Sequence, residues 1–289
     1  MDGVTKNLLS RARVRKARKR WSRLHLQSLA PTNPHWVRGL YAGDGEVIPA
    51  LSPEQTAVVQ KQMEHKLAAA NAAAARLLAA QHMSSLNHGA ACEPASTLAE
   101  LSPRIVQDAK LLRGALNEDE RKSFMEDVLA LFDSTKVLLG AAKNDHRKIN
   151  ESAVMFGNKS AKLLYVVRTD VDPSQEKEVF SLARRIGDSA SQLALSAAER
   201  GPSQQDEAVC GAAGACADSA GTLLYTAKLV APSIHIAECQ QSLVKATDDL
   251  SCHVKDYSDS WAPVQTDEQT KRQLNRDVDK LQRMLDSFK

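Results

Sequence analysis

Apolar side chains recur at spacings of three and four residues along most of the chain, in long stretches separated by prolines. The clearest separators are Pro53, Pro103, Pro173, Pro202, Pro232 and Pro263. This spacing places one apolar stripe along an α-helix, and such stripes are typical of helices that pack side by side. Short apolar runs such as 165–167 lie within helical patterns, so we predict no strand. The sequence therefore predicts an all-α fold.

Three of the prolines follow a residue that can cap a helix. Ser52, Pro53 and Gln55 occupy the cap, first and third positions of a capping box, and Asp172 with Pro173 repeats the arrangement. Each pair predicts the start of a helix. Pro103 follows Ser102 in the same way, so we expect a helix to begin there and not to continue through the proline.

The joins between the helical stretches are only a few residues long, which favours antiparallel neighbours and up-down bundles. Four consecutive helices between about 146 and 262 are enough for one complete bundle. We therefore predict tandem antiparallel bundles, one complete and the neighbouring ones partial. The expected divisions are a basic, disordered arm at 1–48, three helices at 49–144, a four-helix bundle at 145–262 and a single helix at 263–289.

Small and polar residues in the helical stretches predict bundles that open easily. Glycines lie within them, and each costs roughly 1 kcal/mol relative to alanine. These glycines are Gly140, Gly157, Gly187, Gly211, Gly214 and Gly221. Thr135 and Ser160 fall on the apolar stripes, where we expect their hydroxyls to bond back to the preceding turn.

Charge is distributed unevenly along the 289 residues. Residues 1–40 hold ten Lys/Arg and one acid, a net charge of +9, whereas residues 41–289 hold 28 bases and 34 acids, a net charge of −6. An acidic body is a poor surface for nucleic acid, so no nucleic-acid partner is predicted. Residues 1–24 can instead form a basic segment that binds a membrane or another anionic surface. The N-terminus is also rich in arginine and poor in acidic residues, so a mitochondrial transit peptide is a second interpretation of this segment.

No arrangement of residues predicts an enzyme, a cofactor or a metal site. The catalytic and phosphate-binding motifs GxSxG, GxGxxG, HExxH and the P-loop are absent. The glycines between 39 and 45 indicate a flexible connector. His235 and Cys239 are four residues apart, but Cys239 falls on an apolar stripe, where a free thiol behaves as a small hydrophobic group. Five cysteines without a CxxC pair indicate reduced thiols and a cytoplasmic protein.

Four segments give the chain from about 97 to 289 a resemblance to the rod of the talin family. They run in the same order in both, which is more specific than any single short match among Ala-rich helices. The phrases are AKLLRGALNEDE at 109–120, STKVLLGAAK at 134–143, LLYTAKLVAPSI at 223–234 and ECQQSLVKA at 238–246. The resemblance implies the end of the first rod bundle, the whole second bundle and the start of the third.

Talins are cytoskeletal adaptors that couple integrin receptors to actin at cell adhesions, and tension exposes vinculin-binding helices in their rods. The resemblance implies the same class of function here: vinculin-like partners on opened helices and other adhesion adaptors on the intact bundle. Actin and integrin are implied only through parts of talin that this chain lacks. The alternative is a helical protein that binds membranes or anionic surfaces through residues 1–24.

Three helices occupy positions of the vinculin-binding kind, at 97–117, 147–169 and 236–261. The residues that the resemblance assigns to the first are Leu101, Ile105, Leu111, Leu112 and Leu116. Those of the second are Ile149, Ala153, Phe156, Leu163, Leu164 and Val167, and those of the third are Leu243, Val244, Ala246 and Leu250. The second half of the third helix is more polar than the family pattern, and the middle helix departs from it least.

Overall fold

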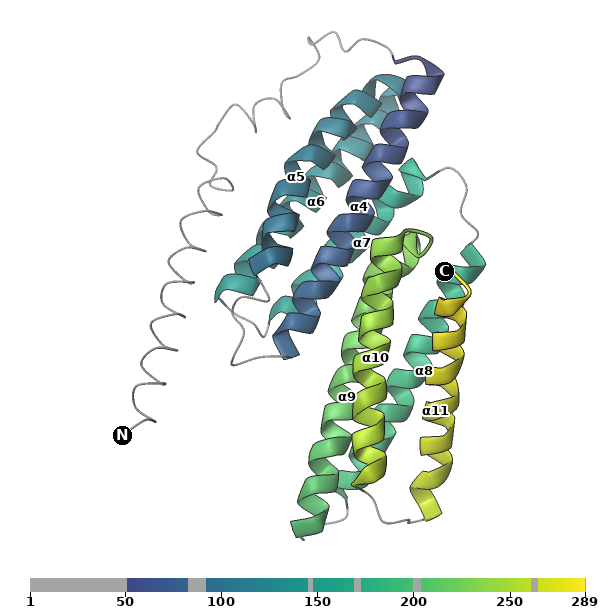
Figure 1. Cartoon of the computed structure of the whole chain (residues 1–289). Coiled ribbons are helices and arrows are strands. Elements are labelled where there is room, and N and C mark those ends of the chain that lie inside the picture. The colour runs from purple at the N-terminus through teal and green to yellow at the C-terminus, as the bar shows by residue number, and fades with distance from the viewer. Residues whose placement is uncertain are drawn as a thin grey trace, which may run out of the picture. The chain divides into compact units, whose positions relative to one another are not determined.

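A computed structural model describes residues 51–82, 92–144, 148–168, 173–199, 204–260 and 265–288. Within these ranges the chain forms eight α-helices and no strand (Figure 1). The prediction of an all-α fold is confirmed. The basic arm predicted at 1–48 lies outside the described residues, as do Asp172 and Pro202.

The chain divides into two compact units after Arg168. The first unit contains α4 (Pro53–His82), α5 (Cys92–Leu112), α6 (Glu118–Asn144) and α7 (Ile149–Val167), with the short 3-10 turn η1 (Arg113–Ala115) after α5. The second contains α8 (Pro173–Ala198), α9 (Gln204–Val230), α10 (Ala237–Asp259) and α11 (Gln265–Asp286), with η3 (Ala231–Ser233) before α10.

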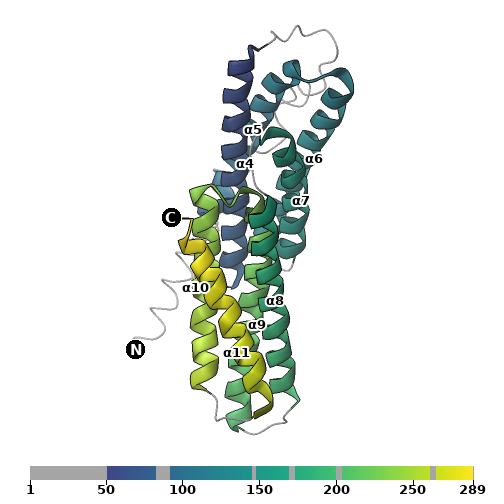
Figure 2. The same ribbon diagram turned by 90° about the vertical axis from the view of Figure 1, so that its right-hand side faces the viewer.

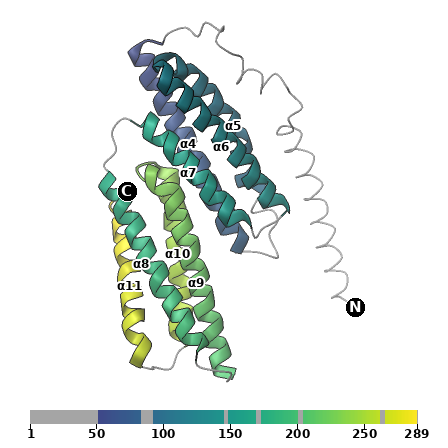
Figure 3. The same ribbon diagram turned by 180° about the vertical axis from the view of Figure 1, so that it is seen from behind.

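Each unit is a ring of four antiparallel helices. In the first, every helix packs against the next one in sequence, and α7 closes the ring against α4, as the view from behind in Figure 3 shows. In the second, α11 closes the ring against α8, and Figure 2 shows α11 with α8 and α10 on either side of it. With four antiparallel helices, each unit has its first helix begin and its last helix end at the same end of the bundle.

This division differs from the one expected from the sequence. The expected boundary near residue 145 assigned the helix at 149–167 to the later bundle, but α7 packs against α4 and α6. The expected single helix at 263–289 is not isolated, because α11 completes the second ring. A stripe shows that a helix buries one face, not which bundle it joins. The grouping observed leaves none of the eight stripes uncovered.

Helix starts follow local capping chemistry. The capping box at Ser52 is confirmed, since Ser52 Oγ accepts from the Gln55 amide at 3.2 Å and Gln55 Oε1 accepts from the Ser52 amide at 3.0 Å. A second box precedes α6, where Asn117 Oδ1 accepts from the Glu120 amide at 2.9 Å. This box was not predicted from the sequence, because asparagine takes the place of the usual serine.

Pro103 lies inside α5 and does not begin a helix, which corrects the expectation for this residue. An interior proline removes one backbone hydrogen bond and costs about 3 kcal/mol. Leu98 and Ile105, which flank Pro103, are both buried, and burying side chains of this size contributes roughly 1.5–3 kcal/mol each. Packing on both sides of the proline therefore offsets its local cost.

The two hydroxyls on the apolar stripes behave differently. Thr135 Oγ1 donates to the carbonyl of Leu131 at 2.9 Å, as predicted. Ser160 does not follow the prediction: its Oγ is buried and has no hydrogen-bond partner among the described residues. Thr226 Oγ1 in α9 is likewise buried and has no hydrogen-bond partner among the described residues. A buried hydroxyl without a hydrogen-bond partner costs about 1–3 kcal/mol of folding stability. Both units therefore contain a destabilising group in their cores.

Candidate partner-binding helices

The three helices singled out in the sequence correspond to α5, α7 and α10. The first two belong to the first unit and the third belongs to the second. Each is one member of a closed ring, so its apolar stripe faces the core of its own unit. The structure thus distributes the candidate stripes over both units.

The stripe of α7 is fully covered. All six of its candidate residues are buried, and Ala153, Leu163 and Leu164 have no exposed surface. The full set of six is Ile149, Ala153, Phe156, Leu163, Leu164 and Val167. The opposite face carries apolar residues in contact with solvent, of which Tyr165 and Val166 are the most exposed. The helix therefore has two apolar surfaces, and only one of them is hidden.

The stripe of α5 is only partly buried. Ile105 and Leu112 lie in the core, Leu101 is half-buried, and Leu111 is 43% exposed. Leu116 lies beyond the helix, after η1, in extended backbone. The helix predicted at 97–117 therefore begins earlier and ends earlier than expected, and the structure separates Leu116 from the other four candidates.

The stripe of α10 extends beyond the four residues that the resemblance assigned to it. Leu243, Ala246 and Leu250 are buried as a continuous row, whereas Val244 is half-buried and lines a groove. Val254 and Tyr257, in the half expected to be more polar, are also buried. The polar residues of that half lie on the solvent side. Val254 and Tyr257 follow the same spacing of three and four but are not among the residues that the resemblance assigned.

Two thiols in the core of the second unit have strongly shifted acidity. Burial raises the pKa of Cys216 in α9 from its usual 9.0 to about 11. Burial, and then the negative charge of Glu238, raises the pKa of Cys239 in α10 to about 12. Both thiols therefore stay protonated at neutral pH, and the protonated form is a poor nucleophile and a poor metal ligand.

These shifts predict a fall in stability at alkaline pH. The folded pKa values lie above the unfolded ones, so the contribution of the two thiols is constant below about pH 9 and declines above it. At about pH 10 the loss is expected to be roughly 1 kcal/mol per thiol. Urea unfolding at neutral pH and at about pH 10 measures it, by comparing the wild type with Cys216→Ala/Cys239→Ala. The exposed Cys252 supplies the control, Cys252→Ala, and an equal pH dependence in all three proteins would contradict the prediction.

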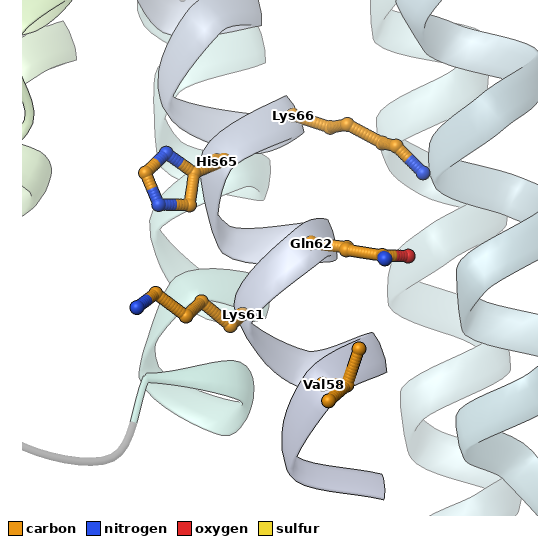
Figure 4. Close-up of a pocket in the computed structure, with 5 residues that line it drawn as sticks. All are labelled: Val58, Lys61, Gln62, His65 and Lys66. Atoms are coloured by element: carbon orange, nitrogen blue, oxygen red, sulfur yellow. The ribbon is translucent and has the colours of Figure 1, made fainter. Parts of the chain in front are cut away.

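Two surface depressions lie in the described part of the chain. One is lined by a single face of α4, where Lys61 and His65 point to one side and Gln62 and Lys66 to the other, beside Val58 (Figure 4). Lys66 forms an ion pair with Asp108 of α5. The second is the groove between the beginning of α10 and the end of α11, where Val244, Leu285 and Phe288 lie beside polar residues.

No three His, Cys, Asp or Glu side chains in the described ranges lie close enough together to hold a metal ion. Cys239 is buried, whereas His235 is exposed in the turn before α10. Of the described helices, none is both long enough and apolar enough to cross a membrane. Residues 1–24, which carry the alternative hypothesis of membrane binding, lie outside the described residues.

Comparison with known proteins finds a distant similarity. No family model matches the chain. A stretch of 122 residues, about 40% of the chain, is 30% identical to talin-1 of Gallus gallus. The matched region is only 5% of the length of talin-1, so the chain corresponds to a small part of that protein. The match is also shorter than the resemblance from about 97 to 289.

Proposed function

We propose that the chain is a non-enzymatic adaptor segment of the talin-rod type, whose hidden helices bind a vinculin-like protein when a bundle opens. The observation that carries the proposal is the complete burial of the α7 stripe in a chain distantly similar to talin-1. In the closed unit no partner can reach Phe156, Leu163 or Leu164. Once released, α7 can place that stripe in the groove of a partner as an amphipathic helix.

The composition of the helices supports opening under modest load. Four interior glycines, Gly140, Gly211, Gly214 and Gly221, have no atom near the place where a Cβ would lie, so packing does not require them. Each weakens its helix by roughly 1 kcal/mol relative to alanine. The buried hydroxyls of Ser160 and Thr226 add to this cost. Both units are therefore less stable than the same helices would be with alanine in place of these glycines and with every buried hydroxyl hydrogen-bonded.

The topology of each unit supports opening from one end. Because the first helix begins and the last helix ends at the same end, force applied through the chain pulls on the seam between those two helices. The seam then separates one turn at a time, and only a few side-chain contacts resist at any moment. In the first unit this seam lies between α4 and α7, so opening it uncovers α7 directly.

We further propose that this activity takes place at cytoskeletal adhesions, with other adhesion adaptors binding the closed units. Links to actin and to integrin would depend on other parts of a talin-like assembly. The chain itself would supply hidden docking helices and no chemistry.

Stopped-flow binding of vinculin head to the full chain tests the proposal. The observed rate is expected to reach a plateau as vinculin head increases, because opening of the unit limits binding. A peptide covering 147–169 is expected to bind without such a plateau. A peptide covering α8 is the matched control, since α8 is also amphipathic but is not assigned a partner. Failure of the 147–169 peptide to bind, or equal binding by the α8 peptide, would contradict the proposal.

A further inference from the structure

α11 is held in the second unit differently from its neighbours. Its described residues bury four large apolar side chains, Leu274, Val278, Leu281 and Leu285. α8 buries seven apolar residues in the same core. α8 also packs closely against two helices, α9 and α11, whereas α11 packs closely only against α8 and meets α10 at few positions. α11 therefore has the smallest apolar attachment to the ring.

Charged and polar side chains make up the remaining attachment. Asp277 of α11 is almost fully buried, with its side chain 3% exposed, and forms an ion pair with Arg185 of α8. The other carboxylate oxygen, Oδ2, accepts a hydrogen bond from Gln273 Nε2 at 3.0 Å. Lys280 Nζ lies 2.9 Å from Glu178 Oε1 of α8. On the other side, Gln282 Nε2 donates to Ser251 Oγ of α10 at 3.1 Å.

The two ion pairs lie along one seam. Glu178 and Arg185 are separated by two turns on α8, so they share a face, and they meet α11 about 10 Å apart along the helix. Glu178 is the nearer of the two to the beginning of α8, which is the end of the unit where α11 finishes. The groove between α10 and α11, lined by Val244, Leu285 and Phe288, opens at this same end. Separation that starts there meets Lys280–Glu178 first and Arg185–Asp277 second.

We infer that α11 is a detachable helix of the second unit and that the Arg185–Asp277 pair is the clasp that holds it on α8. A buried carboxylate is tolerated only while it is paired, so loss of Arg185 favours states in which Asp277 reaches water. α11 can provide that state by leaving the ring while α8, α9 and α10 stay together. Its departure uncovers the core on the side toward α11, including part of the α10 stripe. The inference rests on the proposed function only for what α10 binds once it is uncovered.

Native-state hydrogen exchange of the full chain, without any partner, tests the clasp. Arg185→Met is expected to speed exchange of the α11 amides at least about tenfold relative to those of α9. Arg276→Met is the matched control, because Arg276 is exposed on α11 and its guanidinium donates within the helix to the Arg272 carbonyl. The control is expected to leave α11 exchange unchanged. Arg185→Met/Asp277→Leu, which removes the buried charge as well, is expected to restore protection.

The inference is overturned if Arg185→Met speeds exchange in α8, α9, α10 and α11 by the same factor, or has no effect on α11. Should Arg185→Met not fold, the wild type provides the second measurement. Raising the salt concentration screens partly exposed ion pairs, so exchange in α11 is expected to speed up selectively. Equal salt dependence across the four helices would overturn the clasp. Because no vinculin is present, these results do not depend on whether the proposed partner binds.

Discussion

Leu164→Asp is expected to weaken binding of the 147–169 peptide to vinculin head by at least about 100-fold. Leu164 has no exposed surface in the closed unit and lies in the C-terminal part of the stripe proposed to enter the partner's groove. A carboxylate there loses apolar contact and must give up water without a partner group. Isothermal titration of the peptide with vinculin head measures the change.

The neighbouring residue Val166 supplies the matched control. It lies on the same helix, two residues from Leu164, and is 48% exposed. Val166→Asp adds the same charge to the opposite face, so peptide binding is expected to stay close to that of the wild type. Unchanged affinity in Leu164→Asp, or an equal loss in both peptides, would remove the α7 stripe as the docking surface.

The same two substitutions in the full chain separate docking from folding. Leu164→Asp is expected to destabilise the first unit by roughly 3–5 kcal/mol, since it removes a buried side chain and buries a charge. Val166→Asp is expected to change stability by less than about 0.5 kcal/mol. Urea unfolding of both variants gives these values. A destabilised Leu164→Asp chain that still fails to bind vinculin head shows that opening alone is not sufficient.

Replacing Gly211, Gly214 and Gly221 together by alanine is expected to stabilise the second unit by about 2–3 kcal/mol. All three lie within α9, and the space where each new Cβ would lie is empty. The gain comes from backbone entropy, because the unfolded chain loses freedom and the folded chain gains no strain. Urea unfolding measures the gain. Opening of the second unit is expected to become roughly 30- to 150-fold rarer.

Gly140→Ala in α6 is the control for this triple variant. It makes the same chemical change in open space but lies in the first unit. It is expected to stabilise the first unit by about 1 kcal/mol and to leave α9 exchange unchanged. A triple variant with unaltered stability would show that the glycines are not the source of the weakness proposed for this bundle.

Local features of the fold were predictable from the sequence because they depend on neighbouring residues. The stripe of α7 follows from the spacing between Ile149 and Val167, and the start of α4 follows from the Ser52 capping box. The position of Pro103 inside α5, and not at the start of a helix, could not be predicted from the neighbouring residues alone. Its cost is local, but the packing of Leu98 and Ile105 that offsets it depends on other helices.

The grouping of helices and the clasp could not be predicted, because both depend on contacts between distant segments. The joins before and after α7 are both short, so their lengths did not decide which unit it enters. Asp277 looks like one more surface acid in a polar helix, and only its burial beside Arg185 distinguishes it. Likewise, Leu111 and Leu112 are adjacent members of one apolar pattern, but only Leu112 is in the core. The spacing therefore predicted the buried residues of α7 in full and those of α5 only in part.

Stretching single molecules of the full chain in the presence of vinculin head tests the central claim most directly. Each unit is expected to extend in its own step and to refold when the force is released. With vinculin head added during the extended period, refolding of the first unit is expected to be blocked, because the α7 stripe is occupied. Refolding at an unchanged rate in saturating vinculin head would contradict the claim that hidden stripes become docking surfaces.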